Sequence, residues 1–135
     1  MLQTEKSKQL IKDAILDNDF LKKLDSTQIR EVVECMYEKQ VKQGHYIIRE
    51  GDAGQHLYVA ADGDFEVLKD THVLGKMAAG RAFGELAILY NCTRTASVRA
   101  VTDVRVWVLD RRIFQAIMMK TGIQRQEENI NFLKR

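Results

Sequence analysis

The chain has 135 residues, of which 45% are hydrophobic and 30% are charged, and its formal net charge at pH 7 is only +2. A chain of this length forms one domain with its own core, and such a balanced charge gives no reason to expect nucleic acid or a membrane surface as a partner. No apolar run approaches the ~20 residues of a transmembrane helix, and the start is not a signal peptide.

The N-terminal third has helical periodicity. Residues 5–16 predict one helix, residues 17–19 interrupt it, and residues 20–24 form a short apolar turn. Asp25 is the expected N-cap of a second helix, because Gln28 three residues later completes a capping box. The predicted core-facing residues of the two helices are Leu10, Ile11, Ala14, Ile15, Ile29, Val32, Val33 and Met36.

After Met36 the pattern changes to short strand-like runs that glycines separate. These runs are Val41, Tyr46–Ile48, Leu57–Ala60, Phe65–Leu68, Val73–Leu74, Ala96–Val101 and Val104–Leu109. The sequence 62–64 is the expected hairpin turn, Gly75 and Gly80 mark further bends, and Trp107 is an expected core residue. We therefore predict an antiparallel meander that closes as a small barrel or jelly roll.

The periodicity becomes helical again at Asp110, which is placed to cap a helix that ends near Gly122. The apolar stripe of this helix contains Ile113, Phe114, Ile117 and Met118. Residues 123–135 predict a further helix. The chain is thus expected to be an α+β domain with helices at both ends of a β-barrel.

The cysteines and histidines have no metal-ligand spacing. Cys35 and Cys92 are expected to be buried thiols, and two thiols in a chain of this size suit a reducing cytosol. His45, His56 and His72 are expected at the surface or in hairpins. We expect no metal and no cofactor.

The segment Phe83–Val98 combines residues that suit a small anion. Gly84 lets the backbone approach a ligand closely, and Leu86–Tyr90 is long enough for about one inserted helical turn whose N–H groups face an anion. Arg94 offers a planar fork of donors to a phosphate, and Glu85 could accept from a sugar hydroxyl. From the residues alone, a plain turn before a helix and a structural Glu85–Arg94 ion pair remain alternatives.

This segment resembles the phosphate-binding cassette of the cyclic-nucleotide-binding domain. Tyr90–Ala96 resembles the first such domain of cGMP-dependent protein kinases, and Ala14–Phe20 and Ile117–Gly122 look like the type I members. The resemblance covers nearly the whole chain. It implies a cyclic-nucleotide-binding domain at residues 1–121 and, at 122–135, a helical connector towards a second nucleotide-binding domain.

The resemblance implies a role for each residue of the phosphate and ribose site. Arg94 would bind an exocyclic oxygen of the cyclic phosphate. The backbone amides of Leu86 and Ala87, at the start of the inserted helix, would bind the same group. Gly84 and Glu85 would bind the ribose 2′-hydroxyl, Glu85 through its carboxylate.

Base recognition is implied at a second set of residues. The hydroxyl of Thr95 would accept from the exocyclic amine of guanine, which adenine lacks. One hydrogen bond is worth ~0.5–1.5 kcal/mol, so cGMP should be favoured over cAMP by at most about tenfold. Leu74 and Gly75 would line the base side of the pocket.

The implied function is that of a non-catalytic sensor that binds cGMP, and cAMP more weakly, and controls a Ser/Thr protein kinase through its C-terminal helices. The chain is expected to be an excised, monomeric fragment of a cytoplasmic, homodimeric kinase. Two alternatives stay open. A cAMP-binding regulatory subunit is disfavoured by Thr95 and by the run Tyr90–Cys92. A cupin-type metalloenzyme is disfavoured by the spacing of the histidines.

Overall fold

The computed structural model describes residues 4–85 and 93–120. The helices are α1 (Glu5–Asp17), the 3₁₀ helix η1 (Leu21–Lys23), α2 (Ser26–Cys35) and a helix over residues 111–120. The strands are β1 (Tyr37–Val41), β2 (Tyr46–Ile48), β3 (His56–Asp62), β4 (Phe65–Lys69), β5 (His72–Met77), β6 (Ala82–Phe83), β7 (Ser97–Ala100) and β8 (Val104–Asp110). The predicted stop at Gly122, the helix 123–135 and the cassette residues Leu86, Ala87 and Cys92 lie outside this range.

Side-chain caps define the N-terminal helices. The Thr4 side chain accepts from the first turn of α1. The Asn18 side chain accepts from two backbone amides at 3.0 Å and so turns the chain into η1. Asp25 accepts from the Gln28 amide at 2.8 Å, while the Gln28 side chain accepts from the Asp25 amide at 3.0 Å. The predicted capping box is therefore confirmed.

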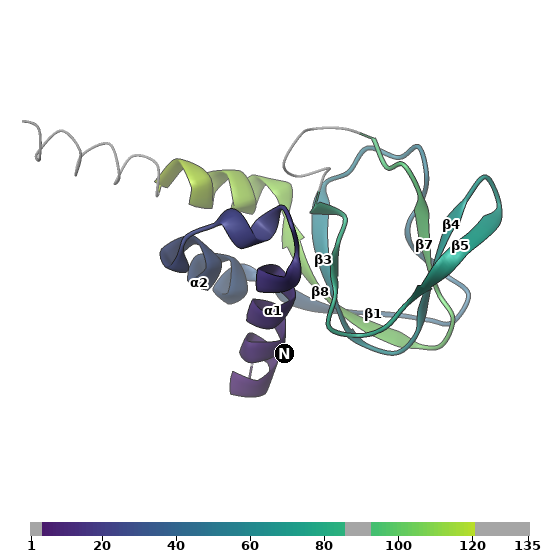
Figure 1. Cartoon of the computed structure of the whole chain (residues 1–135), viewed down its shortest axis with the longest axis horizontal. Coiled ribbons are helices and arrows are strands. Elements are labelled where there is room, and N and C mark those ends of the chain that lie inside the picture. The colour runs from purple at the N-terminus through teal and green to yellow at the C-terminus, as the bar shows by residue number, and fades with distance from the viewer. Residues whose placement is uncertain (1–3, 86–92, 121–135) are drawn as a thin grey trace, which may run out of the picture.

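The strands form two four-stranded sheets with the orders β1-β8-β3-β6 and β2-β7-β4-β5, and all the pairs are antiparallel. They face each other as the barrel-like body in Figure 1. Alternate residues meet between them and form an apolar core. That core contains Val41, Ile48, Tyr58, Ala60, Phe65, Phe83, Val98, Ala100, Val104, Val106 and Val108. The predicted jelly roll with helices at both ends is confirmed. The predicted meander is wrong, because among the described strands only β4 and β5 are neighbours both along the chain and within a sheet.

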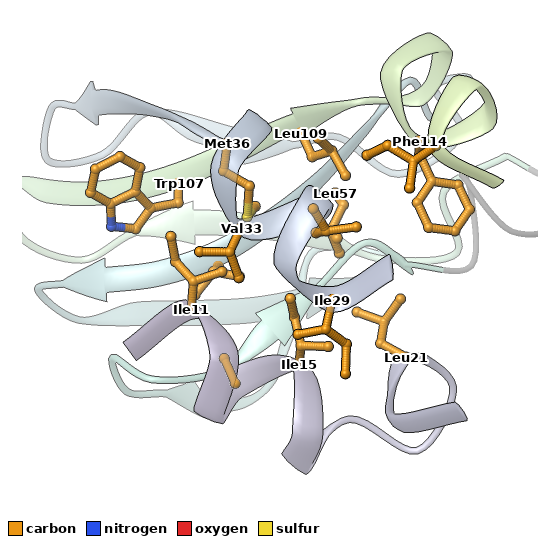
Figure 2. Packing of buried hydrophobic residues seen from close by; sticks show 14 residues of the cluster. Ile11, Ile15, Leu21, Ile29, Val33, Met36, Leu57, Trp107, Leu109 and Phe114 are labelled. Carbon is orange, nitrogen blue, oxygen red and sulfur yellow. The ribbon is translucent and has the colours of Figure 1, made fainter. Parts of the chain in front are cut away.

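A second core lies where the helices cover the outer face of β1-β8-β3-β6. Figure 2 shows residues from α1, η1 and α2 meeting Leu57, Trp107, Leu109 and Phe114. Trp107 is 1% exposed, as predicted for a core residue. Phe114 and Ile117 are buried in the same cluster, so the helix over 111–120 is anchored where β8 ends.

Three details differ from the sequence prediction. Gly75 does not mark a bend but lies inside β5, beside an irregularity in the pairing with β4. Cys35 is exposed, because it lies beside and not on the inward stripe of α2. His56 is half-buried within β3 rather than in a surface hairpin, because it pairs with Asp110 at the end of β8.

Candidate functional site

Arg94 is held at the entrance to β7 by its own backbone. Its amide donates to Asp52 O at 2.8 Å, and its carbonyl accepts from Gly51 N at 2.8 Å. An isolated bridge between Ala53 and Thr93 continues this pairing. The turn at residues 51–53 therefore fixes the position from which the arginine side chain extends.

The guanidinium group of Arg94 lies in a half-buried site lined by main-chain carbonyls. Its Nη1 donates to Gly84 O at 2.8 Å and its Nη2 donates to His56 O at 2.7 Å. Its central carbon lies 6.0 Å from the ring centroid of Tyr58, which stacks on Phe83 at 5.3 Å. A fixed cation is thereby held within the predicted cassette with its fork of donors oriented.

Gly84 has no room for a side chain. Its φ is +81°, and an added Cβ would lie 2.7 Å from Arg94 Nη1 and 3.2 Å from Ile48 Cδ1. The sequence argument required a glycine here so that a ligand could approach the backbone. The structure adds a second reason, which is that the arginine itself occupies the space.

The other site residues predicted from the sequence have different placements. Glu85 is half-buried and helical, directly after Gly84. Thr95 is exposed and directly follows Arg94. Leu74 is 64% exposed and lies with Gly75 on β5, two strands away from β7 in the same sheet. The described structure therefore brings residue 84 into contact with the arginine and leaves the base-side residues on an outer strand.

His56 is a part of this site that the sequence analysis did not identify. Its carbonyl accepts from Arg94, and its Nε2 lies 3.0 Å from Asp110 Oδ1. The hydroxyl of Tyr37 donates to the same carboxylate oxygen at 3.2 Å. Gln55 O accepts from the backbone amide of Arg111 at 2.8 Å. The β3–β8 register places His56 beside Asp110, and the β1–β8 register places Tyr37 near the same carboxylate. Short sequence patterns do not reveal these long-range pairings.

Burial determines the ionisation of the tyrosine beside the arginine. Burial raises the pKa of Tyr58 above its ordinary value of 10.0, and the nearby Asp110 carboxylate acts in the same direction. The positive charge of Arg94 acts in the opposite direction but does not cancel the effect of burial. Tyr58 is therefore a neutral ring at physiological pH, suited to apolar stacking on Phe83.

Residues 4–85 and 93–120 lack both a metal-binding cluster and a membrane-spanning helix. Within these ranges, no group of three or more His, Cys, Asp and Glu side chains is arranged to hold a metal ion. Within the same ranges, no helix is both long and apolar enough to cross a membrane.

A β-sandwich with an oriented guanidinium beside a glycine has the chemistry that suits a small anionic ligand. Residues 38–121 match the family model described as the cyclic nucleotide-binding domain. The chain belongs to this family.

The relatives and related structures include cGMP-dependent protein kinases and regulatory parts of protein kinase A. The chain is 62% identical over 128 residues to "cGMP-dependent protein kinase, isozyme 1" of Drosophila melanogaster. The matched region covers 94% of this chain and 17% of that kinase. The structure "cAMP bound PfPKA-R" is 34% identical with a TM-score of 0.77, covering 87% of this chain and 43% of that one. The cAMP-bound regulatory domain of Toxoplasma gondii PKA is 32% identical with a TM-score of 0.74, covering 98% and 52%.

Proposed function

We propose that this chain is a non-catalytic cyclic-nucleotide sensor that binds cGMP and, more weakly, cAMP. The observation that carries the proposal is the oriented Arg94 guanidinium, held by Gly84 O and His56 O at 2.8 and 2.7 Å beside the start of the inserted helix. A cyclic phosphate carries one negative charge with exposed oxygens, and an oriented guanidinium binds such a group by charge-assisted hydrogen bonds.

The remaining contacts follow from this placement. Arg94 and the amides of Leu86 and Ala87 would bind the phosphate, while Gly84 and Glu85 would bind the ribose 2′-hydroxyl. Glu85 directly follows the residue that contacts the arginine. Phosphate and ribose would therefore occupy adjacent positions along the cassette.

The preference for cGMP would come from the base. Thr95 is exposed next to Arg94, so its hydroxyl could accept from the guanine amine when the base lies over the phosphate. Leu74 and Gly75 would contact the base from β5. The relative that is 62% identical is named for cGMP, whereas the cAMP-bound structures are 34% and 32% identical. We therefore assign cGMP, the nucleotide in the name of the more similar protein.

The sensor would act within a longer chain, since this one spans 17% of the length of the Drosophila kinase. We assign the domain to residues 1–121 and a connector to 122–135. In the parent protein, a cytoplasmic Ser/Thr kinase homodimer, a second nucleotide-binding domain would follow. Ligand binding would shift the C-terminal helices and thereby regulate the kinase domain, provided that the ligand binds the two arrangements with different affinity.

Titration calorimetry with cGMP and with cAMP tests the proposal. Arg94→Ala should weaken the binding of both nucleotides by about thirtyfold or more, because a charge-assisted, partly desolvated contact is worth ~2–3 kcal/mol or more. Arg30→Ala is the matched control, because Arg30 is an exposed arginine on α2. It should bind both nucleotides like the wild type.

Near-normal binding by Arg94→Ala would remove the phosphate assignment. If the wild type bound neither cGMP nor cAMP, the proposed function as a whole would be wrong. If cAMP bound more tightly than cGMP, the chain would still be a cyclic-nucleotide sensor, but its preferred ligand would be cAMP.

A further inference from the structure

The start of β3 contacts both the candidate ligand site and the first turn of the C-terminal helix. On one side, His56 O accepts from Arg94 Nη2 at 2.7 Å. On the other, the His56 ring lies 3.0 Å from the carboxylate of Asp110, the last residue of β8. The preceding residue, Gln55, accepts from the Arg111 amide at 2.8 Å. Two consecutive residues thus connect the arginine to the helix over 111–120.

We propose that Gln55 and His56 transmit ligand occupancy from Arg94 to the helix over residues 111–120. This inference rests on the proposed function. A phosphate that binds Arg94 competes for the same Nη groups that now donate to Gly84 O and His56 O. A weaker bond to His56 loosens the start of β3, which in turn weakens the contacts to Asp110 and Arg111.

The geometry favours transmission through this segment because the strand interiors next to it are buried and paired. Leu57 and Val59 of β3 and Leu109 of β8 are each 0% exposed. The antiparallel pairing of β3 with β8 runs from His56–Asp110 to Asp62–Arg105, so the two strands are held together along their interiors. Change is least costly at the strand end, where the side chains of His56 and Asp110 are 37% and 46% exposed.

Asp110 is the residue at which to interrupt the transmission, because it contacts the helix side and not the arginine. Asp110→Ala removes the partner of the His56 ring and also the acceptor of the Tyr37 hydroxyl. Tyr37→Phe removes only the second contact and is the matched control. In the absence of a role in transmission, the two variants would respond to cGMP alike.

The readout is amide hydrogen exchange of Arg111 and residues 112–120 in the 135-residue chain, without nucleotide and at saturating cGMP, with saturation verified by calorimetry. In the wild type and in Tyr37→Phe, cGMP should change the Arg111 exchange rate by about threefold or more. In Asp110→Ala that change should fall to less than half. His56→Ala, which removes the other member of the pair, should give the same reduced response.

An equal cGMP response in Asp110→Ala and the wild type would overturn the proposal, as would a cGMP-saturated wild type whose helix does not respond. Absence of cGMP binding by the wild type would instead refute the proposed function. If the variants are too unstable to be saturated with cGMP, denaturant unfolding without nucleotide provides a second test. The denaturant midpoints of Arg94→Ala and Asp110→Ala should then combine non-additively, and strict additivity would overturn the proposal.

Discussion

The guanidinium of Arg94 occupies the space that a side chain at position 84 would need. Nη1 is 2.8 Å from Gly84 O and would be 2.7 Å from an added Cβ. Gly84→Ala should therefore displace the guanidinium in addition to straining a backbone with φ of +81°. We expect cGMP affinity to fall by about tenfold or more, measured by calorimetry, and stability to fall by ~1–2 kcal/mol, measured by urea unfolding.

Gly44→Ala separates the two effects. Gly44 has nearly the same φ, +84°, but an added Cβ there would meet nothing within 4 Å. This control should therefore lose a similar amount of stability and keep its affinity for cGMP. Equal losses of affinity in the two variants would show that strain alone, and not the position of Arg94, controls binding.

Thr95→Ala tests base recognition separately from phosphate binding. The hydroxyl is assigned to the guanine amine, so its removal should weaken cGMP by up to about tenfold and leave cAMP unchanged. Competition titrations of the two nucleotides against each other measure the ratio directly. Thr93→Ala is the control, since Thr93 is also exposed and lies on the other side of Arg94. Equal weakening of both nucleotides by Thr95→Ala would remove its role in selectivity.

Much of the fold could be predicted because its signals are local. The capping box at Asp25 is readable from residue types, and Trp107 lies in an alternating run. β6 could not be predicted, because two residues have no periodicity and its pairing with β3 is set by the sandwich. The Tyr37 end of β1 was also missed, because its residues are largely exposed and polar.

The candidate site could be predicted only in part, for a related reason. Gly84, Glu85 and Arg94 belong to one segment whose residue types suit an anion. The partners of the guanidinium, however, are backbone carbonyls 10 and 38 residues away. Any residue supplies a carbonyl, so no residue type at position 56 could indicate this contact. The contact depends instead on the packing of the two sheets, because His56 begins β3 in one sheet and Arg94 lies just before β7 in the other.

Tyr58 should make the protein sensitive to alkaline pH. Burial raises the pKa of Tyr58 above 10.0 in the folded state, so the folded form retains its proton more strongly than the unfolded form. This contribution to stability is complete below pH 10 and is lost as the pH rises through the folded pKa. Urea unfolding at pH 9 and pH 11 should therefore show a smaller loss of stability in Tyr58→Phe than in the wild type. Equal losses would show that other groups dominate this pH range.

The capping box of α2 should contribute measurably to stability, because α2 forms part of the core that also anchors the helix over 111–120. Asp25→Ala removes the acceptor of the Gln28 amide and should destabilise the protein by ~1 kcal/mol in urea unfolding. Asp19→Ala is the control, because the Asp19 carboxylate is exposed and pairs with the exposed Lys22 at 3.4 Å, so its loss should stay within ~0.5 kcal/mol. Since the cap lies in the helical layer and the nucleotide contacts lie in the sandwich, Asp25→Ala should keep its affinity for cGMP. A loss of affinity comparable to that of Gly84→Ala would mean that the N-terminal helices help to shape the site.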